Sequence, residues 1–174
     1  MIKVCLADNH PVTHFGVKSY FKDHDQISIV ANVGNFSMVR DILQTKEIDI
    51  LILDLELEGL SSIFEIKSIL KNFPKTKIVI FSDLAEQMYA PNAIKAGVSG
   101  YVHKTEKLET LGHSIIKVHE GKIIINETVR KNMALIAKQS KSERLYRKLS
   151  NREIEVLRYL SDGKKNNEIS KILS

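Results

Sequence analysis

The side chains best suited to chemistry in this chain follow four apolar runs of sequence. Asp8 and Asn9 come after IKVCLA, Asp54 comes after LIL, Ser82 after KIVIF, and Lys104 at the end of GYVHK. Two carboxylates, a hydroxyl and an ammonium group make a site for a hard cation such as Mg²⁺ and for a phosphoryl group. Each residue also has a purely structural explanation, because Asp and Asn cap helices and lysines are usually solvated. That explanation is hardest to hold for Asp54, since an acid inside an apolar run needs a partner such as a cation.

The segments that position these side chains follow a repeating βα pattern. Five short apolar runs, rich in β-branched residues, alternate with segments of helical apolar spacing: IKVCLA, ISIVANV, IDILILDL, KIVIF and GYVHK. The alternation predicts an α/β fold, namely a doubly wound five-stranded parallel sheet that is flavodoxin-like, with strand order 2-1-3-4-5. In that order ligands bind where the strand order reverses, between the carboxyl ends of the first and third strands. Asp8 and Asp54 lie at those two ends.

The net charge of +5 is unevenly distributed along the 174 residues. Residues 1–121 hold 13 Lys/Arg and 15 Asp/Glu, whereas residues 122–174 hold 13 Lys/Arg and 6 Asp/Glu. The basic part predicts an acidic partner, for which nucleic acid is the commonest choice, against the simpler explanation of a solvated surface. The chain shows neither a long uncharged apolar run nor a signal-peptide pattern, so we expect a cytoplasmic protein without a membrane span. Cys5, within an apolar run, is expected to be a buried structural thiol.

Other kinds of site fit the sequence less well. His10 and His14 are four residues apart, but Pro11 disfavours helical backbone at His10, so a helix-borne zinc pair is not expected. The glycine-rich phosphate loops of nucleotide-binding enzymes are absent, and DNHPV after the first strand is unlike the hydroxyl-rich loop that binds flavin phosphate. We therefore expect a protein that is not an enzyme.

The sequence beyond Gly121 has a different character. NETVRKNMALIAKQ predicts a helix, and the polar SKSERLYRK predicts a linker. LSNREIEVLRYLSDG predicts a second helix that begins with a capping box of Ser150 and Glu153 and stops at Gly163. NNEISKILS predicts a short third helix that buries Ile169, Ile172 and Leu173.

The residues at the strand ends resemble the receiver domain of response regulators over about residues 1–121. The opening ADNHPV together with AGVSGYVHK is similar to the NarL/FixJ type. The resemblance implies that Asp54 is the phosphoacceptor, which takes a phosphoryl group from the phosphohistidine of a sensor histidine kinase with the help of Mg²⁺. It implies phosphoryl-binding and switch residues at Ser82, Tyr101 and Lys104, and metal ligands at Asp8, Asn9, Asp54 and Glu56.

The C-terminal residues resemble the start of a LuxR-type helix-turn-helix domain, whose opening reads LSxRExEVLxLxxxG and then xEIAxxL. The implied organisation is a receiver domain at 1–121, a linker with a helix at 122–148, and the N-terminal part of an all-α DNA-binding domain at 149–174. The recognition helix that enters the major groove lies beyond these residues, and we expect the natural chain to continue past Ser174. The implied DNA-binding scaffold residues are Arg152, Lys164, Lys165 and Asn166.

Two functions remain open at this point. The first is a two-component response regulator and transcription factor, in which phosphorylation of Asp54 changes homodimerisation, through a helix at 107–120, and DNA binding. The second is a phosphorylation-independent interaction module that acts through partner proteins. Asn9 favours the second, because it replaces the family's usual second acid with a neutral amide and so weakens the attraction for Mg²⁺.

Overall fold

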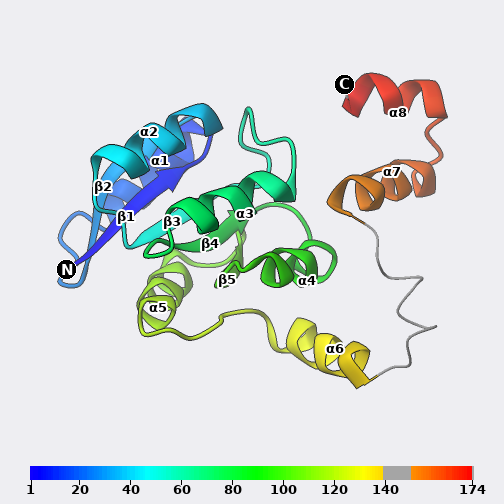
Figure 1. The fold of residues 1–174 in the computed structure, drawn as a ribbon. Coiled ribbons are helices and arrows are strands. Elements are labelled where there is room, and N and C mark those ends of the chain that lie inside the picture. Colours follow the sequence, from blue (N-terminus) through cyan, green and yellow to red (C-terminus); the bar gives the residue numbers. More distant parts are fainter. Residues whose placement is uncertain (139–149, 174) are drawn as a thin grey trace. The chain divides into compact units, whose positions relative to one another are not determined.

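The computed structural model describes residues 1–138 and 150–173, which leaves the predicted linker SKSERLYRK outside the described residues. The chain divides into two compact units, Met1–Arg130 and Lys131–Ser174. In the first unit strands and helices alternate five times (Figure 1): β1 (Ile2–Ala7), α1 (Pro11–Tyr20), β2 (Ile27–Val33), α2 (Phe36–Thr45), β3 (Ile50–Leu53), α3 (Ile63–Asn72), β4 (Lys77–Ser82), α4 (Glu86–Ala96), β5 (Gly100–His103) and α5 (Leu108–His119).

The five strands form one parallel sheet in the order β2-β1-β3-β4-β5, which confirms the predicted fold. All four residues of β3 are completely buried, as expected for the central strand of a sheet covered on both faces. Cys5 is buried in β1, where burial raises the pKa of its thiol to about 12. The prediction that Cys5 is buried is therefore confirmed.

Helices cover both faces of this sheet (Figure 1). On one face α1 and α5 pack against alternate strand residues through Phe21, Leu111 and Ile115. Gly112 lets α5 approach closely, because a Cβ there would lie only 3.1 Å from the Phe21 ring. Helices α2, α3 and α4 cover the other face with buried side chains such as Val39, Ile66, Ile69, Tyr89 and Ala93.

The segment that follows α5 returns to the edge of the sheet at β5. Ile124 forms a parallel bridge with Gly100, the Tyr101 N–H donates to the Ile124 carbonyl at 2.8 Å, and the Ile124 N–H donates to the Ser99 carbonyl at 3.0 Å. Val129, just beyond, is buried. The compact unit therefore extends past residue 121, where the sequence led us to expect the receiver to end.

Three helices follow this segment: α6 (Glu127–Lys138), within the predicted helix, α7 (Asn151–Ser161) and α8 (Asn166–Leu173). The Ser150–Glu153 capping box at the start of α7 is confirmed, and Gly163 has the left-handed φ of +77° that suits the end of the helix. Ile169 is buried and Leu173 is half-buried, but Ile172 is 47% exposed, so its predicted burial is wrong. A pair of short helices can cover only a narrow stripe of α8, and Ile172 lies outside it.

Candidate functional site

Three charged side chains that the sequence predicts at the ends of strands meet at the carboxyl edge of the sheet: Asp8, Asp54 and Lys104. The Asp54 N–H donates to the Ala7 carbonyl at 2.9 Å, and the Lys104 N–H donates to the Ser82 carbonyl at 3.0 Å. These hydrogen bonds continue the pairing of the parallel strands and so hold the backbone of Asp54 and of Lys104 in place. Asp8 and Asp54 are both buried, with 0% and 1% exposure. This edge is where strand order reverses in a doubly wound sheet, and ligands bind there.

The ammonium group of Lys104 bridges the two carboxylates. Its Nζ lies 2.6 Å from Asp54 Oδ2 and 2.8 Å from Asp8 Oδ2, and the lysine side chain is only 10% exposed. Burial raises the pKa of Asp8, but the Lys104 ammonium group and the hydrogen bonds from His10 lower it by more, so the net pKa lies below its ordinary value. Burial lowers the pKa of Lys104, and its bonds to Asp54 and Asp8 more than offset this, so its net pKa is raised.

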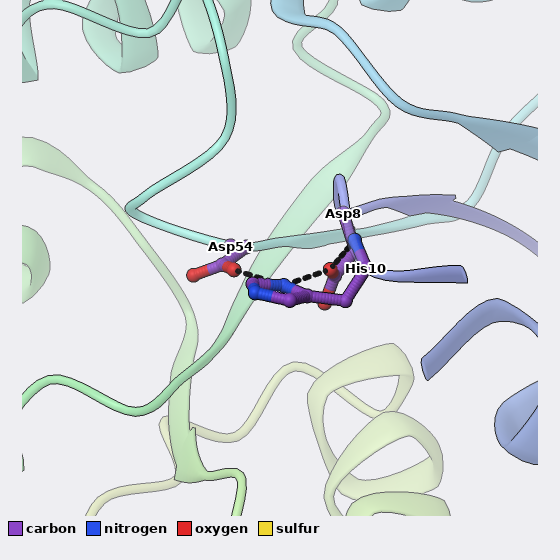
Figure 2. Close-up of side chains that lie close together, drawn as sticks. All are labelled: Asp8, His10 and Asp54. Atoms are coloured by element: carbon purple, nitrogen blue, oxygen red, sulfur yellow. Dashed lines mark hydrogen bonds and ion pairs between the residues drawn. The ribbon is translucent and has the colours of Figure 1, made fainter. Parts of the chain in front are cut away.

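His10 also belongs to this cluster, although it was not among the site residues predicted from the sequence (Figure 2). It is the N-cap of α1 with extended backbone, φ −90° and ψ 114°, which agrees with the expectation that Pro11 keeps it out of the helix. Its backbone N–H donates to Asp8 Oδ1 at 2.7 Å, and its Nδ1 lies 2.9 Å from the same oxygen. Ligand atoms of Asp8, His10 and Asp54 all lie within 4.8 Å of one another. His14 instead contacts the main-chain oxygen of Asp8.

Two other predicted metal ligands lie at the margin of the cluster. Asn9 is exposed, and its neighbour His10 takes the position beside the carboxylates. The Glu56 side chain is also exposed, while its backbone N–H donates to Asp54 Oδ1 at 3.1 Å. Glu56 therefore helps to orient the Asp54 carboxylate through its main chain.

The hydroxyls of Ser82 and Tyr101 both bind the main chain of Leu84. Ser82 Oγ accepts a hydrogen bond from the Leu84 N–H at 3.4 Å, and the Tyr101 hydroxyl donates to the Leu84 carbonyl at 2.8 Å. Both residues are buried, and burial raises the pKa of Tyr101. One turn of backbone after β4 thus links the serine beside the site to the tyrosine on β5.

The basic residues expected to belong to a DNA-binding scaffold lie on α7, on α8 and in the turn between them. All four are exposed, and Arg152 forms a 3.4 Å ion pair with Glu155 one turn further along α7. The Lys165 N–H donates to Glu168 Oε2 at 2.7 Å at the start of α8. The group consists of Arg152, Lys164, Lys165 and Asn166.

Family comparisons agree with both parts of this description. The family model for the response regulator receiver domain matches residues 4–116, and the model for bacterial regulatory proteins of the luxR family matches residues 147–174. The chain belongs to the response regulators that join a receiver to a luxR-family domain, which are two-component regulators of transcription.

Individual relatives of the chain belong to the same class. It is 30% identical to the Fimbriae Z protein of Salmonella typhimurium over 171 residues, which cover 98% of this chain and 80% of the relative. It is 27% identical to the response regulator protein VraR of Staphylococcus epidermidis over 172 residues, covering 97% of this chain and 80% of VraR.

Solved structures share the fold. One is RcsB from Salmonella enterica serovar Typhimurium, bound to promoter rprA in the presence of the phosphomimetic BeF3⁻. The two chains superpose with a TM-score of 0.69 at 24% identity, and the match covers 99% of this chain and 83% of RcsB. A LuxR-family two-component response regulator from Aurantimonas has a TM-score of 0.69 at 23% identity, covering 79% of this chain and 98% of that one.

Proposed function

We propose that Asp54 accepts a phosphoryl group from a sensor histidine kinase and that this modification controls dimerisation and DNA binding. The observation that carries the proposal is the position of the Lys104 ammonium, 2.6 Å from Asp54 and 2.8 Å from Asp8. A carboxylate nucleophile beside a fixed positive charge can form an acyl phosphate whose new oxygens the same charge stabilises.

The transfer exchanges one bond to phosphorus for another. An Asp54 oxygen attacks the phosphorus of the donor phosphohistidine, a P–O bond forms, and the P–N bond breaks as the departing imidazole keeps the electron pair and takes up a proton. Both Asp54 oxygens accept a hydrogen bond, Oδ1 from the Glu56 N–H at 3.1 Å and Oδ2 from Lys104 Nζ at 2.6 Å, so the carboxylate is held in one orientation for attack. Lys104, already in contact with Oδ2, remains beside the phosphoryl oxygens.

The residues at this edge fit a divalent cation. Asp8 and Asp54 contribute two buried carboxylates, which are hard donors, and with His10 their ligand atoms lie within 4.8 Å of one another. Mg²⁺, when bound, supplies positive charge that stabilises the phosphoryl oxygens during transfer. Asp8 and Asp54 are the residues that would hold it.

The response to phosphorylation passes through Leu84. A phosphoryl group on Asp54 offers acceptors to the Ser82 hydroxyl, which presently accepts from the Leu84 N–H. When Ser82 turns to the phosphoryl group, the backbone of Leu84 shifts and its bond to Tyr101 is no longer optimal. The turn at Leu84 thus has two arrangements, and phosphorylation shifts the equilibrium between them.

The remaining assignments follow from the family and the charge distribution. We propose a receiver domain at 1–121, a linker at 122–148 whose first residues, up to Arg130, belong to the same compact unit as the sheet, and a DNA-binding part at 149–174. Arg152, Lys164, Lys165 and Asn166 would support DNA contact. We also propose that the protein is a cytoplasmic homodimer that acts as a regulator and not as an enzyme. Among the described residues, none of the helices has the length and apolar character needed to span a membrane.

Intact-mass measurement after incubation with phosphoramidate and Mg²⁺ tests the proposal. The wild-type chain should gain one phosphoryl group and Asp54→Asn none. Asp83→Asn is a matched control, because it removes an exposed carboxylate next to Ser82 and should leave labelling intact. Labelling of Asp54→Asn, or none in the wild type at millimolar Mg²⁺, would show that Asp54 is not the phosphoacceptor.

A phosphorylation-independent interaction module is the second candidate function. One observation favours it: Asn9 contributes no charge to the site, where the family pattern has a second acid. This function predicts that Asp54→Asn binds its partner proteins and its promoter as the wild type does. A change in dimerisation or DNA affinity on phosphorylation of the wild type would exclude it.

A further inference from the structure

The shortest contacts that hold the His10 imidazole over the candidate site are those to Asp8. The His10 N–H and ring Nδ1 both contact Asp8 Oδ1, at 2.7 and 2.9 Å. This arrangement turns the ring back toward the strand ends, as Figure 2 shows, while the side chain stays 55% exposed. An imidazole fixed in this way is accessible to ions from solvent and faces two carboxylates.

The spacing of the potential ligand atoms suits a single ion. His10 Nδ1 lies 2.9 Å from Asp8 Oδ1 and 3.8 Å from Asp54 Oδ2. Two ligands bound at about 2.1 Å from one ion are roughly 3.0–3.4 Å apart in octahedral or tetrahedral coordination. The first separation lies just below this range and the second just above it, so each requires an adjustment of a few tenths of an ångström at most.

A cation already lies among these three groups. Lys104 Nζ is 3.3 Å from His10 Nδ1, in addition to its contacts with Asp8 and Asp54. The buried Asp8 Oδ2 forms an ion pair with the ammonium group but no well-directed hydrogen bond with any described residue. In the tautomer that carries its proton on Nε2, the His10 Nδ1 lone pair points with the two carboxylates toward this positive charge. A divalent ion bound by the three groups would take the place of the ammonium group, and Asp8 Oδ2 would be available to it.

We propose that His10 is a nitrogen ligand for a divalent cation at this site, so that the site prefers imidazole-binding ions such as Co²⁺ over Mg²⁺. Asn9 supplies no carboxylate, so one anionic oxygen ligand of the family pattern is missing. The imidazole nitrogen of the next residue, His10, is the potential ligand beside it. Mg²⁺ favours oxygen ligands and retains its water, whereas imidazole suits transition metals. The inference concerns the site of the proposed function, but it does not require that Asp54 be phosphorylated.

Calorimetric titration of the full chain with Co²⁺ and with Mg²⁺ tests this ligand assignment. His10→Ala should lower Co²⁺ affinity by about tenfold or more, because even the loss of a group that only supports a ligand costs that much. The Mg²⁺ affinity of this variant should change by less than about twofold, because Mg²⁺ prefers oxygen ligands and an imidazole nitrogen contributes little to its binding. His113→Ala is the matched control, since it removes an exposed histidine from α5, outside the cluster.

The outcomes separate a specific ligand from surface binding. Loss of Co²⁺ affinity in His10→Ala alone supports the proposal, and a change in the visible absorption of bound Co²⁺ in that variant identifies the lost nitrogen. Equal Co²⁺ affinity in His10→Ala and wild type, or equal losses in His10→Ala and His113→Ala, overturns it. Phosphoramidate labelling of the wild type with Mg²⁺ is scored separately, so its failure rejects Asp54 as phosphoacceptor without affecting the result for His10.

Discussion

The sheet unit at 1–130 and the helix pair α7–α8 differ in what holds them together. Every residue of β3 is completely buried between two layers of helices. In residues 150–173, by contrast, Ile169 is the buried residue among the described side chains, while Leu157 and Leu160 are 50% and 43% exposed. The helix pair depends more on local signals such as the Ser150–Glu153 capping box. Substitutions should therefore have large effects in the sheet unit and small ones in the helices.

Truncation of a central core residue should produce the largest difference between the two regions. Ile52→Ala removes a side chain with 0% exposure from β3 and should cost about 4 kcal/mol of unfolding free energy, because the surroundings cannot fill the cavity. Leu157→Ala in α7 should cost less than about 1 kcal/mol, because half of that side chain is already in water. Urea unfolding followed by circular dichroism measures both, and equal losses would contradict the comparison.

Removal of the bridging lysine should have the next largest effect. Lys104→Met leaves Asp8 and Asp54 buried side by side without their positive partner, and we expect a loss of about 3 kcal/mol. Lys117→Met is the control, because its ion pair with Glu120 is exposed at the surface and should contribute less than about 1 kcal/mol. Thermal unfolding at pH 7 distinguishes them; a stable Lys104→Met would mean that the two carboxylates are held by other groups.

Acid should weaken the sheet unit through Asp8. Its pKa is lowered in the folded state from an ordinary value of 3.8, so its contribution to stability is present above that pH and is lost as the pH falls through the folded-state pKa. Unfolding midpoints measured from about pH 5 to about pH 2, on both sides of the ordinary pKa, should fall less steeply for Asp8→Asn than for the wild type. Parallel curves for the two proteins would show that Asp8 gains no stabilising partner on folding.

Loss of the cap should have the smallest and most local effect. Ser150→Ala removes the oxygen that accepts from the Glu153 N–H at 3.3 Å and should cost α7 about 1 kcal/mol. Amide hydrogen exchange in α7 should speed up about fivefold, the factor that corresponds to 1 kcal/mol, with the sheet unchanged. Ser161→Ala is the control, because that hydroxyl binds the Arg158 carbonyl at the other end of the helix.

Topology explains which site residues could be predicted from sequence. Asp8, Asp54 and Lys104 follow apolar runs that must be parallel strands, and the carboxyl ends of such strands share one edge whatever the side chains do. His10 could not be assigned, because its place depends on a ring orientation set by one hydrogen bond to Asp8. The burial predicted for Ile172 failed because helical periodicity identifies an apolar face but not what covers it.

The return of Ile124 to the sheet bears on aggregation. A terminal strand with free backbone groups is a template for pairing with other chains, and natural proteins cover such edges. Here the Ile124 backbone occupies the Tyr101 N–H and the Ser99 carbonyl beside β5. A fragment cut at Gly121 would lose this cover and should form large aggregates at concentrations where a fragment ending at Lys138 forms none, which light scattering would reveal. In this protein the first residues of the linker protect the edge of the sheet that precedes it.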